Sequence, residues 1–414
     1  MTEILLAAPF FLAALLFVVV IGFVRPKVFF VLLMALILRT ALALIHAFVV
    51  PLPDSQADAV MYHHTAEMWS SEGLGGALKH FTTGAFLYSW VLAVIYSLTG
   101  PVELAGQSLN VLLGVASVYL VWRIAMCLTN GDVRTAKRAA WIAAFFPTLN
   151  LYSAITMREA FIVFFFLLGT LYIINWSQNW SPVQFVKGTA AYLASGFFHT
   201  GMFMSIITLG FLLSSMQAYK LLKQRGRLSL KLLGAAVFLV FAAAVVLMTG
   251  WGMDKIGIAK NISYFHEYTS SERAGYLQSM TVESPLDLIW QAPIRLFYFL
   301  FAPFPWMVRS AIDLFGLVDA LLYFLMTSMI IGRWKNIDSR ALKFSLAVVA
   351  VGLLAFALAT SNYGQAIRHR AKFAPLLIPM ALAVSRKAKA RARDRVKGKA
   401  MWNERQEVGS GATS

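Results

Sequence analysis

The chain has 414 residues, of which 59% are apolar and only 13% are charged. A soluble domain of this length would carry nearly twice that density of charge, so the composition excludes an ordinary soluble protein. The formal net charge is +17, but the basic residues gather at the ends of apolar runs and in a tail from Arg386 to Lys399. That placement is typical of membrane topology and not of nucleic-acid binding. The single cysteine, Cys127, excludes an intrachain disulfide.

Continuous apolar runs near twenty residues recur along the chain, long enough to cross a hydrocarbon core as α-helix. They do not alternate apolar with polar residues, so strands are the poorer alternative. The predicted fold is therefore an all-α polytopic bundle of about 11 transmembrane helices. The first run lacks a basic leader and a cleavage site, so it is expected to be retained. The predicted spans are 4–24, 28–50, 107–128, 138–155, 160–176, 185–199, 201–217, 231–250, 310–332, 341–361 and 372–386.

The distribution of Lys and Arg predicts the sidedness of these spans, because cytoplasmic loops hold most basic residues. Two further apolar stretches, 86–100 and 286–302, are assigned to the membrane surface, since counting either as a span would move basic loops to the wrong side. The expected protein is multi-pass in the plasma (bacterial inner) membrane, with its N-terminus outside and its C-terminus cytoplasmic. The basic segments placed inside are Arg25–Lys27, Arg134–Arg138, Lys220–Lys231, Arg333–Arg340 and the tail.

The first outside loop carries Asp54 and Asp58 after two helix-breaking prolines. Asp58 and Tyr62 are four residues apart, so on a helix they share one face. A carboxylate held there could act as general base on a hydroxyl group. The simpler alternative, favoured by spacing alone, is that Asp54 or Ser55 caps a short surface helix and both aspartates keep it soluble.

A second acidic point, Glu159, follows Arg158 at an outside hairpin between two apolar runs. Glu159 at the start of the next helix would interact favourably with the helix dipole, which is the simpler reading. Adjacent opposite charges on so short a turn also suit an anionic, metal-linked or hydroxylated ligand.

A third cluster lies in the turn from Asn362 to Lys372, with Arg368, His369 and Arg370. Cations on the outer face depart from the positive-inside pattern, and a lipid-linked phosphate or pyrophosphate would explain them. Headgroup contact or snorkelling is the alternative. Three further outside residues, Lys79, His80 and Arg295, support the ligand interpretation.

Several weaker signals lie at or near predicted spans. Arg39 is near the middle of the second span, where a charge is costly, so it is expected to face the bundle and meet an acceptor. His46 lies in the same span. His199 could face the outer cavity, although a lone histidine is more often a packed, hydrogen-bonded residue.

In this order the chain resembles the GT-C superfamily of membrane glycosyltransferases, which includes protein mannosyltransferases, aminoarabinose transferases and the RgtA-like group. In that superfamily an acidic residue of the first outside loop precedes a tyrosine by four positions, as Asp58 precedes Tyr62. Surface helices follow, matching 56–72 and 86–100, and a second acidic motif matches Arg158-Glu159. The resemblance covers roughly residues 28 to 215 well and the remainder loosely. Ala59 stands where many relatives have Glu.

The resemblance implies a transferase that moves a sugar from a polyprenyl-phosphate donor to a glycan or glycolipid acceptor on the outer (periplasmic) face. Asp58 and Glu159 would be catalytic, and a divalent metal such as Mg²⁺ or Mn²⁺ remains open. It also implies one catalytic domain, 1–386, with a GT-C-like module (28–215), a variable module (216–386) and a basic, disordered cytoplasmic tail (387–414). The residues expected to bind substrate are Asp54, Tyr62, Lys79, His80, Arg158, Arg295, Arg368, His369 and Arg370.

Two other functions stay open at the level of sequence. An oligosaccharide repeat-unit polymerase or ligase, of the Wzy-like kind, would also use outside arginines but could work without a carboxylate base. A transporter of lipid-linked solutes is the third reading, although the chain lacks the internal repeats and broken midplane helices typical of transporters. The donor, the acceptor and the lipid bilayer are the expected partners, and nucleic acid is not.

Overall fold

The computed structural model describes residues 2–223, 274–278, 280 and 287–388. Within those residues the chain is helical, and its one β-bridge joins Gly275 to Asn362. The predicted span 231–250 and the tail beyond residue 388 lie outside the described residues. The all-helical fold class is therefore confirmed for the described part of the chain.

Six of the described helices are long and apolar enough to cross a bilayer. This indicates a membrane protein with a lipid bilayer around it, but the predicted count of eleven spans is not confirmed. The six are α1 (Thr2–Val24), α2 (Pro26–Phe48), α6 (Glu103–Leu128), α9 (Glu159–Asn179), α15 (Ala311–Ile331, apolar from Asp313) and α16 (Arg340–Ala359).

The predicted spans 185–199 and 201–217 correspond to helices that are not among these six. The first is α10 (Pro182–Phe198); the second is a 3-10 turn, η2 (Thr200–Phe203), that continues into α11 (Met204–Lys223). Residues 374–388 are helical and cover the last predicted span.

The predicted span 138–155 is not one helix. The chain forms α7 (Val133–Phe145), breaks at Phe146 and restarts as α8 (Pro147–Tyr152). Pro147 causes the break, because it has no N–H to donate to the carbonyl four residues earlier, on Ala143. A proline at the first position of a helix is well tolerated, so α8 begins there.

Arg39 of α2 supplies the donors that this break removes. Its side chain is buried, and its Nη2 and Nη1 donate to the carbonyls of Ala143 and Ala144 at 3.4 and 3.2 Å. Carbonyls freed inside a membrane protein need such partners. The prediction that Arg39 faces the bundle and meets an acceptor is confirmed.

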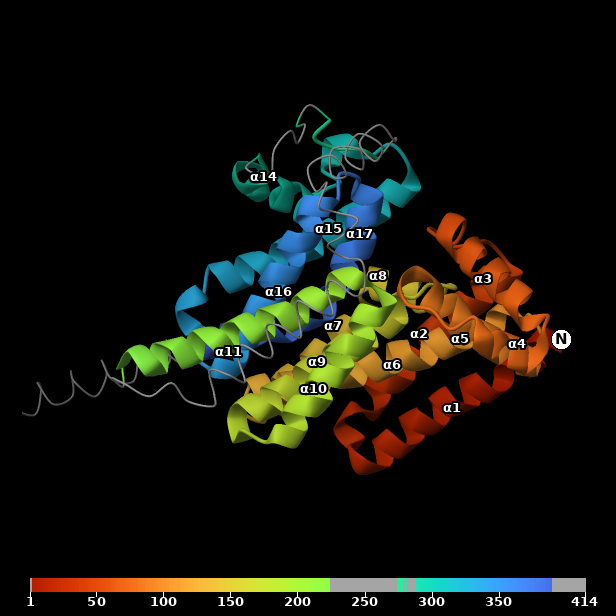
Figure 1. Ribbon diagram of the computed structural model, residues 1–414, viewed down its shortest axis with the longest axis horizontal. Coiled ribbons are helices and arrows are strands. Elements are labelled where there is room, and N and C mark those ends of the chain that lie inside the picture. Colours follow the sequence, from red (N-terminus) through yellow and green to blue (C-terminus); the bar gives the residue numbers. More distant parts are fainter. Residues whose placement is uncertain (1, 224–273, 279, 281–286, 389–414) are drawn as a thin grey trace, which may run out of the picture.

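The helices α6 and α9 form the centre of the molecule. α6 packs against α1, α2, α7 and α9, while α10 packs along α9. Figure 1 shows α1 at one edge of this bundle, and α14 to α17 as a second group of helices. α1 buries little of its surface, as expected for a helix whose apolar side chains face lipid.

Three short helices form a cap beside the N-terminus, at one end of the long axis (Figure 1). They are α3 (Ala57–Ser70), α4 (Gly73–Lys79) and α5 (Leu87–Thr99). α5 is the stretch assigned to the membrane surface; with its 13 residues it is shorter than the span that a bilayer requires.

The other predicted surface segment forms α14 (Asp287–Phe301). One side buries Gln291, Arg295 and Phe299, whereas Trp290 and Phe297 are exposed on the other. A helix with polar residues inside and aromatic residues outside is suited to a lipid interface.

Candidate active site

The helix α3 places Asp58 in its first turn. Asp58 is half-buried, and Tyr62, one turn later, is almost completely buried. Burial, more than the charges around it, raises the pKa of the Tyr62 phenol to about 12. The predicted cap is wrong: Gln56 occupies the N-cap position, and no side chain caps the helix. Asp58 is therefore free of a capping role.

Glu159 is the first residue of α9 and is only 2% exposed. The turn before it is held by Asn110 of α6, whose amide nitrogen donates to the carbonyls of Ile155 and Met157, each at 2.8 Å. These bonds fix the backbone of the turn that directly precedes Glu159. A buried carboxylate at this position needs a cationic partner.

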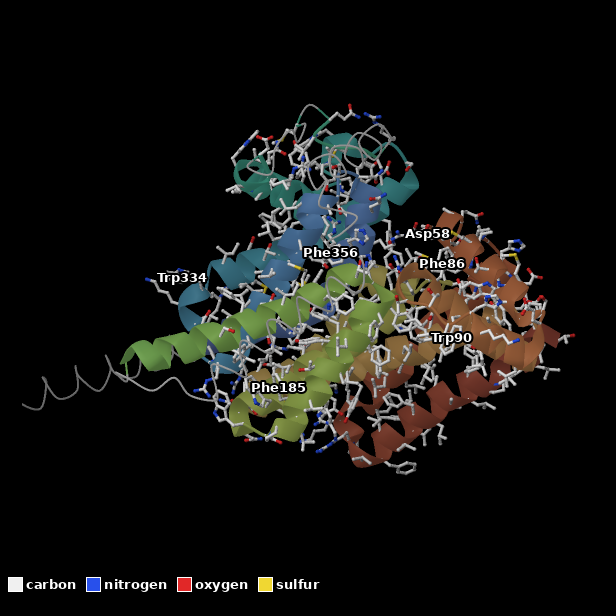
Figure 2. All side chains as sticks on the ribbon, in the orientation of Figure 1. Asp58, Phe86, Trp90, Phe185, Trp334 and Phe356 are labelled. Atoms are coloured by element: carbon white, nitrogen blue, oxygen red, sulfur yellow. The ribbon has the colours of Figure 1, made fainter. Side chains whose placement is uncertain are left out.

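That partner comes from the C-terminal part of the chain. α17 (Tyr363–Ala371) begins where the Asn362 side chain accepts hydrogen bonds from the amides of Gly364 and Gln365. Arg368, on this helix, lies 2.6 Å from Asp58 (Nη1 to Oδ2) and 3.8 Å from Glu159 (Nε to Oε1). Figure 2 shows Asp58 on α3 near the α17 ribbon.

Lys372 completes the arrangement, with its Nζ 3.5 Å from Glu159 Oε1. We call Asp58, Glu159, Arg368 and Lys372 the charged cluster. Its members come from three segments far apart in sequence. Such a group of opposite charges, partly open on the Asp58 side and buried around Glu159, can bind a polar ligand and exchange its ion pairs for contacts to that ligand.

The electrostatics of the cluster are dominated by its carboxylates. Burial alone would lower the pKa of Arg368, but the carboxylates of Glu159, Asp54 and Asp58 outweigh it and raise that pKa. Asp54 thus acts on Arg368 through its charge, although its own residue surface is exposed. The guanidinium remains charged under all physiological conditions.

The donor set of the cluster does not match a metal site. Within the described residues, no group of three or more His, Cys, Asp or Glu side chains is placed so that it could hold a metal ion. Asp58 and Glu159 both face Arg368, which already supplies the positive charge between them. The residues present therefore do not fit a protein-held Mg²⁺ or Mn²⁺ ion.

Arg158 lies beside the cluster but makes different contacts. Its Nη1 donates to the carbonyl of Phe198 at 2.9 Å, and its guanidinium lies 5.9 Å from the centre of the Tyr62 ring. It therefore links the end of α10 to α3 at the rim of the site.

The remaining predicted substrate residues lie elsewhere. Arg370 and Arg295 are completely buried: Arg370 pairs with Asp319, and Arg295 donates to Gln291 at 2.8 Å. His80 stacks on Trp69, with ring centres 5.1 Å apart, and with Lys79 it lies at the end of α4. In the described part of the chain, no recorded side-chain contact joins these four residues to the charged cluster.

Sequence reasoning gave too little weight to His199. This residue follows α10 and meets His369 of α17 edge to face, with ring centres 5.3 Å apart. His369 in turn lies 2.9 Å from Lys372 (Nδ1 to Nζ). The position of His199 at the outer end of a predicted span was the available signal, but a single histidine does not reveal its partner.

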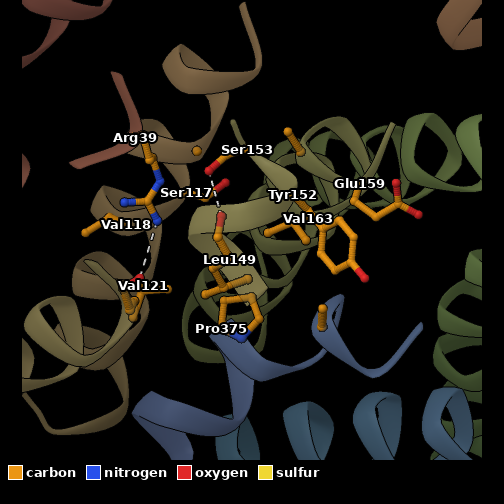
Figure 3. A pocket seen from close by; sticks show the side chains of 14 residues that line it. Arg39, Ser117, Val118, Val121, Leu149, Tyr152, Ser153, Glu159, Val163 and Pro375 are labelled. Carbon is orange, nitrogen blue, oxygen red and sulfur yellow. Dashed lines mark hydrogen bonds between the residues drawn. The ribbon is translucent and has the colours of Figure 1, made fainter. Parts of the chain in front are cut away.

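An apolar pocket extends from the cluster into the bundle. Arg39 and Val118 lie at one side of it and Glu159 at another, with Leu149 and Val163 between them (Figure 3). Glu159 Oε2 is buried without a hydrogen bond within the described residues. The site thus borders on a mainly apolar part of the bundle.

Comparison with protein-family models, with curated proteins and with solved structures finds no match. The resemblance to the GT-C superfamily therefore remains a prediction from the sequence.

Proposed function

We propose that this protein is a membrane glycosyltransferase of the GT-C type. It transfers a sugar from a polyprenyl-phosphate-linked donor to an acceptor at the outer face of the bacterial inner membrane, in the synthesis of a surface polysaccharide or glycolipid. The observation that carries the proposal is the meeting of Asp58, Glu159 and Arg368 in one place. A transferase of this kind needs a base and a cation close together.

The roles follow from the chemistry of each group. Asp58 removes the proton of the acceptor hydroxyl as that oxygen attacks the anomeric carbon. The bond from this carbon to the phosphate oxygen breaks, and the phosphate leaves with the electron pair. Arg368 and Lys372 stabilise the charge on the leaving phosphate, as fixed cations do in a site shielded from water. Glu159 holds both cations in place.

Two features of the surroundings support a lipid-linked donor. The apolar pocket beside Glu159 opens into the bundle and is lined mainly by aliphatic side chains. The helix α14 presents Trp290 and Phe297 outward, as an interfacial helix does. A substrate with a charged head and a long apolar chain would meet both environments.

The test is direct transfer by the purified protein. Full-length protein in nanodiscs is incubated with radiolabelled polyprenyl-phosphate sugars and with a membrane glycolipid fraction as acceptor. We expect label in the acceptor for the wild type and none for Asp58→Asn. The matched control is Glu67→Gln, an exposed acidic residue of the same helix. Full transfer by Asp58→Asn would remove the proposed base.

A further inference from the structure

A second pocket lies beside the charged cluster, between η2, α16 and α17. Its lining includes His199, Thr200, Phe356, Thr360 and His369, and its volume, with the space open to solvent included, is about 450 Å³. Both histidines are half-buried. We call it the histidine pocket.

Hydrogen bonds fix the tautomer of each ring. The Gly201 amide donates to His199 Nδ1 at 3.2 Å; Lys372 Nζ lies 2.9 Å from His369 Nδ1 and, as an ammonium group, can only donate to it. A neutral imidazole whose Nδ1 accepts holds its proton on Nε2. In the part of the chain that the structure describes, no recorded hydrogen bond to protein occupies either Nε2. Two N–H donors thus belong to side chains that line one pocket.

The charges around the pocket are positive. Burial lowers the pKa of His369 well below its usual value, and Lys372, His199, Arg368 and Arg158 lower it further. The neighbouring acid, Glu159, already pairs with Lys372 and Arg368. None of the residues that line the pocket is acidic. A pocket that offers N–H donors, has no carboxylate in its lining and lies among positive charges favours an anion.

We propose that the histidine pocket binds a phosphate group through the Nε2–H groups of His199 and His369, beside Lys372. The threonine hydroxyls of the lining can add further donors. This proposal rests on the proposed function and deepens it, because the phosphate is that of the lipid-linked donor. The phosphate lies beside Arg368 and does not displace Asp58 from it. Arg368 Nη1 then keeps its ion pair with Asp58 until the acceptor arrives.

The pocket links phosphate binding to protonation. A bound phosphate adds negative charge beside His369, which favours the imidazolium and raises the pKa of that ring. By linkage, the part of the phosphate affinity that His369 supplies must increase as the pH falls through the raised pKa. The groups that face His369 from each packed element are Lys372, Arg368, Arg158 and His199. Among these, His199 is the other imidazole that lines the pocket.

The experiment measures binding and not transfer. Inorganic phosphate and polyprenyl phosphate are titrated separately into full-length protein in nanodiscs, at about pH 6 and about pH 8, on either side of the usual histidine pKa. The wild type is compared with His199→Gln/His369→Gln and with the matched control His64→Gln, an exposed histidine of α3. We expect affinity to be about tenfold weaker in the double variant, with a larger difference at the lower pH and the control unchanged; comparison at equal pH cancels the titration of phosphate itself.

The two probes separate the sources of phosphate. If the double variant loses affinity for both probes, the pocket takes a lipid-linked phosphate. If the wild type binds only inorganic phosphate and the double variant loses that affinity, the ligand is a soluble phosphate compound. Unchanged affinity in a correctly folded double variant, or no binding by the wild type, overturns the proposal. If the double variant does not fold, the wild type decides alone: its histidine NMR signals must titrate at higher pH when phosphate is present. Absence of sugar transfer would reject the proposed function without affecting this result.

Discussion

Arg370 and Asp319 form an ion pair in which neither side chain is exposed, with Nε 2.9 Å from Oδ2. Arg370 also donates to the carbonyls of Phe299 and Ala302, which ties α17 to the end of α14. Arg368, two residues earlier, reaches the charged cluster instead. Two positions along a helix differ by about 200° around its axis, so neighbouring arginines serve opposite sides.

Arg370 and Arg368 should therefore respond differently to substitution. We expect Arg370→Met to destabilise the protein by about 3–5 kcal/mol, because it leaves the buried Asp319 carboxylate without its partner. Arg368→Gln, at a partly exposed position, should retain the fold. Fluorescence-detected thermal unfolding in detergent measures both. An unchanged unfolding temperature for Arg370→Met would contradict the structural role of this pair.

Arg368 should control the chemical step. Arg368→Lys retains the charge but loses the planar fork that reaches two carboxylates, so we expect sugar transfer to fall roughly 10²-fold with normal expression. The same assay applied to Asp58→Asn and Glu159→Gln separates transferase from polymerase. If arginine is required while both carboxylates are dispensable, the repeat-unit polymerase becomes the better explanation.

Gly114 of α6 allows Arg39 to reach the broken helix. A Cβ added at Gly114 would lie 2.6 Å from Ser153 Cβ and 2.9 Å from Arg39 Nε. We expect Gly114→Ala to cost about 1–3 kcal/mol through this overpacking. Gly75→Ala, where an added Cβ meets nothing within 4 Å, is the control. Equal unfolding temperatures for the two variants would show that the close approach is not needed.

Asn110 positions Glu159 without being part of the cluster. Asn110→Leu removes the side-chain donor to the carbonyls of Ile155 and Met157, and Ile155 then keeps only its bond from the Met157 amide; this should cost about 1–3 kcal/mol. We expect transfer to fall as well, because the turn before Glu159 loosens. Asn110→Gln can restore part of these bonds, so partial recovery of activity would distinguish positioning from general instability. Full activity in a well-folded Asn110→Leu protein would argue against the positioning role.

Sidedness is tested by chemical labelling. In a Cys127→Ala background, His64→Cys and Lys335→Cys each introduce one thiol, on α3 and on the basic connection before α16. The proposed orientation predicts that a membrane-impermeant maleimide added to intact cells labels the protein at position 64 only. Labelling at position 335 alone would invert the topology and place the charged cluster on the cytoplasmic side.

The sequence by itself determined the class of protein and three of the four cluster residues. Length and continuity of the apolar runs are local properties, so the long helices α1, α2, α6 and α9 were predictable. Asp58, Glu159 and Arg368 were recognisable because polar residues in an apolar chain are costly and need a reason. The break at Pro147 was also present in the sequence, but periodicity alone did not show that it divides a span.

Only the tertiary structure decided which charges meet. The sequence alone does not distinguish Arg368 from Arg370. Packing buries Arg370 against Asp319 and directs Arg368 to Asp58. His199 and His369 are in contact although they lie 170 positions apart in the sequence, and a single sequence does not reveal such a contact. Helical periodicity fixes the face on which a side chain lies, whereas long-range packing fixes what that face meets.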